Sequence, residues 1–467
     1  MALKSISVSS QELRVEEHLR IDTKYFFVKR LFDKLSQSND YEVKSLKDLN
    51  AEISSGSYIA TYVPKEKGIK YFRVSDIKPY NIDENENNLE YVPESVPTKM
   101  KVQENDIIIG RTQATVEKLG VASIIDSELQ GSAISQHVSK IKVNPGIISP
   151  YYLVAYLNSK FFKAQAALAT HGDTRVELTH SQLRTMRVFL PTRDVLSRIE
   201  TKVQTIIQLN RESITLIEKA KQILRNSLKF PSDSEKDVKY FSASNREISE
   251  FGLWNVTSFL PKYFEYERYI KNKFKWKKLG DITNLKRGIE AGSNNYKTYL
   301  FKLPTDYAFI RTSDIINNEI DLYPDYFVSE KVVSDSHNMI KRGDIIFSKD
   351  GKIGEVAIAT KYDRVMIASG FEMIRVKNNP DNITNEYVFT LLLNKETGFY
   401  PSIRRTVVAS TIPHLREDRL KEIPVPIIDE QKINEITELV KKAFELKEKR
   451  KELVLQVSTE IDGFFEF

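Results

Sequence analysis

The chain repeats itself once, with a period near 235 residues, and no other feature restricts its fold as strongly. The clearest match joins residues 71–77 (YFRVSDI) to residues 309–315 (FIRTSDI), 238 positions later. Five further matches keep the same order, and their offset drifts by only three: 19–26 with 257–264, 106–108 with 344–346, 142–145 with 377–380, Tyr152 with Tyr387, and Pro191 with Pro426. A unit this long exceeds a solenoid repeat, so each copy is expected to be a domain with its connection.

Both copies predict the same order of elements. Short β-branched runs predict strands at 106–109 and 138–143, and again at 344–347 and 373–376. Apolar segments predict helices at 151–159 and 386–394, and each is followed by a short strand that ends in proline, at 188–191 and 423–426. We therefore expect an α/β (α+β) tandem repeat of two globular domains.

Each copy leads into a long charged helix whose apolar residues recur every three or four positions, which is typical of a coiled-coil seam. The predicted seam, which is also the predicted partner-docking element, comprises Ile199, Val203, Ile206, Ile217 and Leu224 in the first helix and Ile433, Ile436, Val440, Leu446 and Leu453 in the second. Antiparallel pairing of the two helices would bury both seams, whereas the alternative is that each is an ordinary amphipathic helix on its own domain. Asp194 and Asp429 are predicted to cap their N-termini.

These elements divide the chain into five predicted parts. They are a first domain at 1–192, a first spacer helix at 193–228, a polar linker at 229–256, a second domain at 257–427 and a second spacer helix at 428–467.

Composition and missing motifs narrow the function. The net charge of +6 permits nucleic-acid binding through local patches. The chain has no cysteine, which excludes disulfides and thiolate metal sites, and it has no run of about 18 apolar residues. We therefore expect a cytoplasmic protein. It contains no phosphate-binding loop and no adenine-methyltransferase motif, and its six histidines are scattered, so we expect no catalytic site, metal or cofactor.

Several loops combine Arg or Lys with small polar residues. Arg reads guanine and Asn or Gln reads adenine, while Lys and hydroxyls mostly hold phosphates. For any single loop the alternative is a solvated charge. The predicted DNA-contacting residues are Ser57, Tyr58, Arg111, Thr112, Gln113 and Arg175 in the first copy, and Lys286, Arg287, Asn294, Asn295, Tyr296, Lys349, Lys352, Arg404 and Arg405 in the second.

Residues that the two copies share are interpreted differently. Arg73 and Arg311 are expected to be structural, because a residue identical in both copies is poorly suited to reading different bases. The discriminating residues should be those that differ. Among the glycines, Gly56 is matched with Gly292 and Gly120 with Gly354, either as turns that need positive φ or as points where the backbone approaches DNA.

The ordered motifs 276–282, 286–293, 309–315, 343–354 and 423–431 resemble the target recognition domain of Type I restriction–modification specificity subunits, and the first copy resembles it in a diverged form. The resemblance implies a non-catalytic subunit whose two domains each read half of a split double-stranded DNA target. It implies that the helices space the domains and dock two methyltransferase subunits, which carry S-adenosylmethionine and the adenine-N6 chemistry. It also allows a motor–nuclease subunit as a partner.

Three alternatives stay open. The chain could be the specificity subunit of a Type IIB-like system, whose partner both cuts and methylates DNA. From other classes, the chain could be a nuclease with an unrecognised site or a scaffold that binds no DNA.

Overall fold

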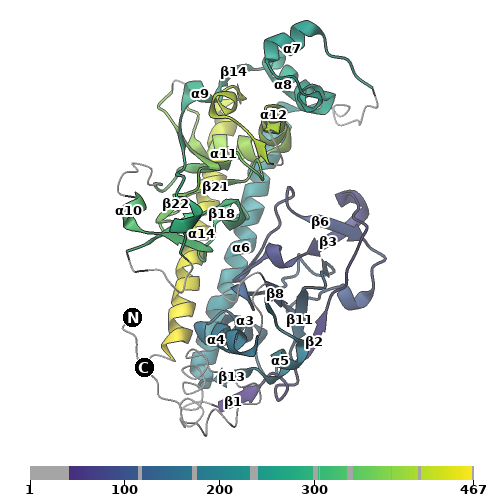
Figure 1. The fold of residues 1–467 in the computed structure, drawn as a ribbon, viewed down its shortest axis with the longest axis vertical. Coiled ribbons are helices and arrows are strands. Elements are labelled where there is room, and N and C mark those ends of the chain that lie inside the picture. Colours follow the sequence, from purple (N-terminus) through teal and green to yellow (C-terminus); the bar gives the residue numbers. More distant parts are fainter. Residues whose placement is uncertain are drawn as a thin grey trace. The chain divides into compact units, whose positions relative to one another are not determined.

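The computed structural model describes residues 42–113, 118–170, 176–231, 240–297, 303, 305–333, 340–379, 381–408 and 412–464 (Figure 1). The chain forms two compact units, one with residues up to 208 and from 452 onwards, the other with residues 209–451. Each unit holds one copy of the repeat together with parts of two long helices, α6 (Arg193–Leu228) and α14 (Glu430–Gly463).

The same four-stranded antiparallel sheet occurs in both copies. In the first copy its order is β2 (Glu52–Ser55), β11 (Val138–Lys142), β7 (Ile107–Gly110) and β9 (Ala122–Ile124). In the second it is β15 (Thr283–Arg287), β23 (Phe371–Val376), β20 (Ile345–Ser348) and β21 (Val356–Ile358). Ile107 lies opposite Ile141, and Ile345 lies opposite Ile374, so the central register is also repeated.

A three-stranded sheet with one parallel pair is repeated as well. Its order is β10 (Ala133–Ile134), β3 (Gly68–Phe72), β6 (Glu90–Pro93) in the first copy and β22 (Val365–Ile367), β16 (Tyr307–Ile310), β19 (Tyr326–Val328) in the second. In each copy the first two of these strands are parallel and the other pair is antiparallel. Two small antiparallel pairs also recur. The first copy pairs β1 (Glu42–Ser45) with β13 (Arg187–Leu190), and the second copy pairs β14 (Lys275–Lys278) with β26 (Pro424–Ile427) in the same way. The first copy also pairs β4 (Ile77–Lys78) with β5 (Asn81–Ile82), and the second pairs β17 (Ile315–Ile316) with β18 (Glu319–Ile320). This shared topology confirms the tandem α+β repeat.

The predicted apolar helices are α3 (Pro150–Leu157) and α11 (Asn385–Leu393). Tyr152 of α3 donates a hydrogen bond to the backbone oxygen of Phe189, and Tyr387 of α11 donates one of 2.8 Å to that of Pro426. Both rings are fully buried. The duplicated tyrosine is explained by this role, because a buried phenol needs a hydrogen-bond partner.

The structure corrects one glycine match and confirms another. A Cβ on Gly56 would lie 1.7 Å from the backbone oxygen of Ile134, and one on Gly288 would lie 2.2 Å from that of Ala368, so Gly56 corresponds to Gly288 and not to Gly292. Gly120 and Gly354 both have positive φ, and a Cβ there would meet Phe162 and Phe399 respectively. A close backbone approach therefore explains the first pair, and positive φ with an aromatic neighbour explains the second.

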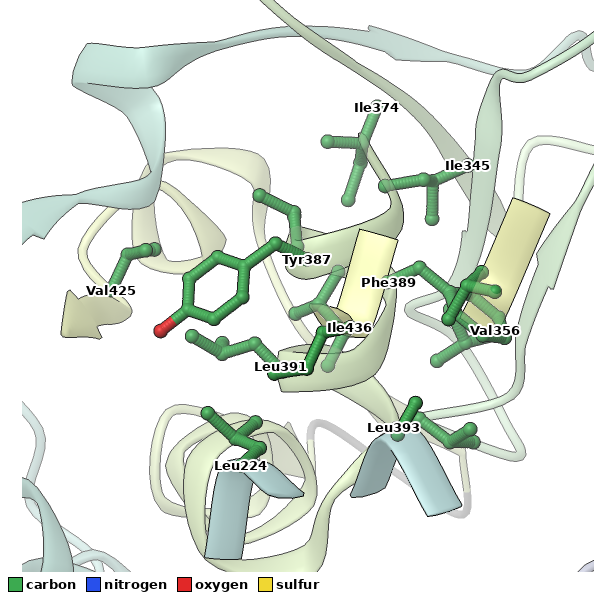
Figure 2. Close-up of a cluster of buried hydrophobic side chains, with 14 of the residues drawn as sticks. Leu224, Ile345, Val356, Ile374, Tyr387, Phe389, Leu391, Leu393, Val425 and Ile436 are labelled. Carbon is green, nitrogen blue, oxygen red and sulfur yellow. The ribbon is translucent and has the colours of Figure 1, made fainter. Parts of the chain in front are cut away.

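Side chains of the two long helices contact each other in both units. In the second unit Glu212 pairs with Lys442 at 3.7 Å, and the apolar core joins Ile217 and Leu224 of α6 to α14. Figure 2 shows Leu224, Ile436 and the α11 side chains around Tyr387 in this core. In the first unit Arg198 and Lys202 of α6 both contact Glu460 of α14, at 2.6 and 2.8 Å. Residues later in α6 therefore contact residues earlier in α14, which is the antiparallel pairing that was predicted.

Most predicted seam residues are buried, and two are not. Leu446 and Leu453 are half-buried, while Val454 and Val457 are almost fully buried. Leu446 still packs against the apolar core of the second unit, and the same helix also buries Lys447 and Lys451. The buried seam residues face the core, which leaves the exposed faces of the helices for any partner.

One of the two predicted helix caps is confirmed. The Asp429 carboxylate accepts a hydrogen bond of 3.0 Å from the backbone N–H of Gln431, so it caps α14. Helix α6 begins at Arg193, which places Asp194 inside the first turn, where its negative charge interacts favourably with the helix dipole without capping. In the part predicted as a linker, Asn245–Phe251 form the short helix α7. None of the described helices combines the length and the apolar character that a bilayer span requires.

Candidate nucleic-acid interface

The segment that follows the central strand has the same backbone arrangement in both copies. The Leu178 N–H donates to the backbone oxygen of Arg111, and the Leu415 N–H donates to that of Lys349, both at 2.8 Å. In the first copy this pairs β8 (Thr112–Gln113) with β12 (Val176–Glu177). In the second copy an isolated bridge joins Asp350 to His414. We call this repeated arrangement, residues 111–112 with 177 and residues 349–350 with 414, the paired segment.

In the first copy the paired segment adjoins a network of polar side chains. The Arg111 guanidinium forms an ion pair with Glu177 and donates to the backbone oxygen of Gln136 at 3.2 and 3.3 Å. Beside it, the His180 Nε2 lies 2.7 Å from the Ser55 hydroxyl and 3.0 Å from that of Ser139. Burial lowers the pKa of His180, and the Arg111 charge lowers it further.

In the second copy the equivalent place is ionic. The His414 Nδ1 lies 3.0 Å from the Asp350 carboxylate, and Lys349 reaches the other Asp350 oxygen at 3.2 Å. Glu372 of β23 occupies the register position of Ser139 in β11. Glu372 is fully buried, and among the described residues neither of its carboxylate oxygens has a hydrogen-bond partner.

This unpartnered carboxyl has a perturbed pKa. Burial raises the pKa of Glu372 to about 7, and the nearby Glu417 carboxylate adds to the effect, against the opposing charges of Lys349, Arg287 and Lys421. A carboxyl that stays partly protonated near neutral pH can both donate and accept a hydrogen bond.

A second repeated feature is an aromatic contact after the matched glycines. Tyr62 packs on Tyr71 with ring centroids 6.1 Å apart, and Tyr296 packs on Phe309 at 5.0 Å. Before this contact the first copy exposes Tyr58, whose relative exposure is 70%. The second copy exposes Asn294 and Asn295 there, and the Asn295 amide donates to the Ala291 backbone oxygen at 2.6 Å.

The structure places the predicted DNA-contacting residues in three groups. Tyr58, Arg287, Asn294, Asn295 and Lys352 are exposed, and Ser57, Arg111, Gln113, Lys286 and Tyr296 are half-buried. Thr112, Lys349 and Arg405 are buried, and Arg404 is only 12% exposed at its side chain. Arg175 lies outside the described residues. The first copy brings together Arg111, Thr112 and Gln113, in and next to its paired segment. The paired segment of the second copy contains Lys349. A separate cluster holds Arg404 and Arg405.

Arg404 and Arg405 are corrected from DNA contacts to structural residues. Arg405 donates to both oxygens of Glu267 at 2.7 and 2.8 Å, and Arg404 donates to the same carboxylate at 2.9 Å. Burial by itself would raise the pKa of Glu267, but the Arg405 charge and hydrogen bonds, with Arg404, hold it well below its usual range. Thr112 and Lys349 are also buried, and their role as DNA contacts stays a prediction.

Arg73 and Arg311 have structural roles, as predicted. The backbone N–H of Arg73 donates to Asp76, and that of Arg311 donates to Asp314, each at 2.8 Å, so the shared Ser-Asp sequence builds the same turn twice. Arg311 also lies over the Tyr326 ring at 4.1 Å.

Four residues of this region were not predicted from the sequence: Glu177, His180, Glu372 and His414. A signal that could have found them exists, since each one differs in type from its counterpart in the other copy. Recognising it requires an alignment of the two copies through divergent strands, which only the strand register provides.

Comparison with known proteins finds a family model that matches the second copy. Residues 271–456 match the model of the Type I restriction modification DNA specificity domain. The specificity subunit of the Type I restriction enzyme HindI from Haemophilus influenzae (strain ATCC 51907 / DSM 11121 / KW20 / Rd) is 24% identical over 169 residues, which are 35% of this chain and 34% of that protein. The matched part thus spans about a third of this curated relative.

Two solved structures are similar at low TM-scores. An S subunit of a Type-I restriction-modification system from M. genitalium has a TM-score of 0.39 and 13% identity, covering 92% of this chain and 98% of its own. The HsdS subunit from Thermoanaerobacter tengcongensis has a TM-score of 0.28 and 14% identity, covering 91% and 97%. The similarity in sequence is thus to the Type I restriction modification DNA specificity domain, over residues 271–456.

Proposed function

We propose that the whole chain is a DNA specificity subunit that recognises a target in two parts. The observation that carries this proposal is the repetition of one sheet topology twice in a single chain, with a specificity-domain match over the second copy. Each copy would read one half of the target through its paired segment and its exposed basic loops. Because the copies differ in side chains, the two halves would differ in sequence.

The proposal includes partners and a division of labour. The chain is itself non-catalytic and works in the cytoplasm. Two methyltransferase subunits dock on the exposed faces of α6 and α14 and supply S-adenosylmethionine and adenine-N6 transfer, and a motor–nuclease subunit joins the same complex. The predicted boundaries at 192, 228, 256 and 427 mark the parts that such a complex would use.

A methylome of the native host, with and without this gene, tests the proposal. The expected result is loss of N6-methyladenine from one split, asymmetric motif when the gene is deleted. An unchanged methylome, together with failure of the complex purified from the host to enrich any duplex, would contradict it. Replacing residues 257–427 with another such domain should change only one half of the motif.

The alternatives give different results in the same samples. A nuclease would cleave DNA with Mg²⁺ as the purified single chain. A Type IIB-like subunit would copurify with one partner that both methylates and cuts. A scaffold would bind no duplex at any salt concentration.

A further inference from the structure

The paired segment has the same backbone in both copies but different chemistry at its exposed positions. Glu177 is the last residue of β12 and His414 is the last residue of β25 (Pro413–His414), and the side chain of each is 47% exposed. Behind them Arg111 is 19% exposed and Asp350 is 21% exposed. Glu177 and His414 thus occupy equivalent exposed positions with different hydrogen-bonding groups. Their partners come from successive positions of the inner segment, because Arg111 corresponds to Lys349 and Thr112 to Asp350.

The polarity of each pair is inverted. In the first copy the carboxylate is on the outer strand, at Glu177, and the cation is Arg111 on the inner segment. In the second copy the carboxylate is on the inner segment, at Asp350, and the imidazole of His414 is on the outer strand. A carboxylate offers only acceptors, whereas an imidazole engaged through Nδ1 offers its Nε2.

A second observation points to a ligand at this place. The carboxyl of Glu372, next to the second paired segment, is fully buried and has no hydrogen-bond partner among the described residues. Its counterpart Ser139 in the first copy is bonded to Ser55 and His180. A buried unpartnered carboxyl is costly, so its retention fits a group that completes its hydrogen bonds only when a ligand binds.

Resting on the proposed function, we propose that the paired segment is the position at which each copy discriminates bases, with Glu177 reading the first half-site and His414 reading the second. Glu177 would accept a hydrogen bond from the exocyclic amine of cytosine or adenine in the major groove. His414, held by Asp350, would meet a different base edge. This inversion makes the two halves of the target unlike.

The test transfers one copy's chemistry to the other. The double variant Thr112→Asp with Glu177→His gives the first copy the pair found in the second. The complex is purified from its host through the full-length chain and used to select duplexes from a random library. We expect the selected motif to change in its first half only, with a loss of at least tenfold in enrichment of the original base at the position read by Glu177.

Glu104→Gln is the matched control, because Glu104 is exposed on the turn before β7, at the opposite end of the strand from the paired segment. Glu177→Gln is a second, milder variant that keeps the size of the side chain and removes only its charge, in case the double variant does not fold. It should relax the preference at the same single position.

The outcomes separate the inference from the proposed function. If the unchanged complex selects a two-part motif and both variants select that same motif with unchanged enrichment, the inference is overturned and the proposed function stands. If the unchanged complex selects no motif, the proposed function fails and the inference fails with it.

Discussion

Lys451, on the long helix α14, donates a hydrogen bond of 2.7 Å to the carboxylate of Asp363 and another of 2.8 Å to the backbone oxygen of Ile320. Its side chain is fully buried. One turn earlier, Lys447 donates to the backbone oxygen of Asn317 at 2.9 Å, and both lysines thereby hold the β17–β18 hairpin of the second copy.

The same contact includes a third basic residue. Arg450 donates to Glu319 of this hairpin at 2.5 Å. Burial alone would raise the pKa of Glu319, but Arg450, Lys447 and Lys451 lower it to about 2. Burial lowers the pKa of Lys447 to about 8, against the opposing charge of Glu319. The second copy is thus fixed to α14 by buried charges in addition to apolar packing.

Lys451→Met should destabilise the second unit strongly. The substitution removes the buried donor of the Asp363 carboxylate and the Ile320 carbonyl. Because breaking a buried ion pair costs about 3 to 5 kcal/mol, we expect the free energy of unfolding to fall by that amount. Urea unfolding of the full chain measures the change. Lys449→Met, at an exposed position of the same helix, is the control and should change stability by less than about 0.5 kcal/mol. Equal midpoints for the two variants would contradict the structural role.

Arg405→Met should have a comparable effect on stability, because Glu267 is almost fully buried and accepts two hydrogen bonds from this guanidinium. We expect the free energy of unfolding to fall by about 3 to 5 kcal/mol. Since Arg405 is buried, the salt dependence of DNA binding should stay the same for protein that is still folded. A shallower salt dependence would restore Arg405 as a phosphate contact. The control is Arg416→Met, whose side chain is 72% exposed.

The repeat, the strands and the antiparallel helices could be predicted from the sequence because they rest on local periodicity and on matches at a constant offset. Buried Lys447 and Lys451 could not, because a lysine within a charged helix normally indicates a solvated face. The backbone oxygens that they contact lie in a hairpin about 130 residues earlier in the chain, and Asp363 lies 88 residues before Lys451, so only the tertiary fold reveals these contacts. The Arg-Arg pair at 404–405 was misassigned for the same reason.

The candidate site was predictable in part. Arg111 stood out because it lies in a loop with small polar residues, but its partner Glu177 lies 66 positions away on a two-residue strand. Strands that short have no detectable periodicity. Glu372 corresponds to Ser139 only through the strand register. The offset between these two residues differs from the offsets of the repeated motifs, so the motifs do not align them.

Glu372→Gln should flatten the pH dependence of stability. The folded chain binds this proton more tightly than the unfolded chain does, because burial raises the pKa of Glu372 to about 7 from its usual 4.5. The free energy of unfolding therefore falls as the pH rises from about 4.5 to 7, and it stays lower above pH 7. The neutral amide removes this decrease, so the variant should be more stable than the parent at about pH 8, by less than about 3 kcal/mol after solvent screening.

Urea unfolding at about pH 5 and about pH 8, on either side of the raised pKa, measures the effect on both proteins. The groups that face this carboxyl are Glu417, Lys349, Arg287 and Lys421. Glu417→Gln is a useful comparison, because it removes one like charge but leaves the buried carboxyl in place, and it should give a smaller gain. An identical pH dependence for parent and Glu372→Gln would show that Glu372 has an ordinary pKa.

Lys352→Ala and Arg287→Ala should each weaken DNA binding without changing the selected sequence, if these exposed side chains neutralise phosphates. The logarithm of the binding constant should depend less steeply on the logarithm of the salt concentration, by about one unit of slope for each phosphate that the variant no longer neutralises. Titration of a duplex carrying the selected motif at salt concentrations between about 50 and 200 mM measures this slope. Lys449→Ala is the control, since its exposed charge is on α14. If Lys352→Ala instead changed the selected bases, Lys352 would be a base-reading residue, and an unchanged slope with unchanged affinity would place it outside the DNA interface.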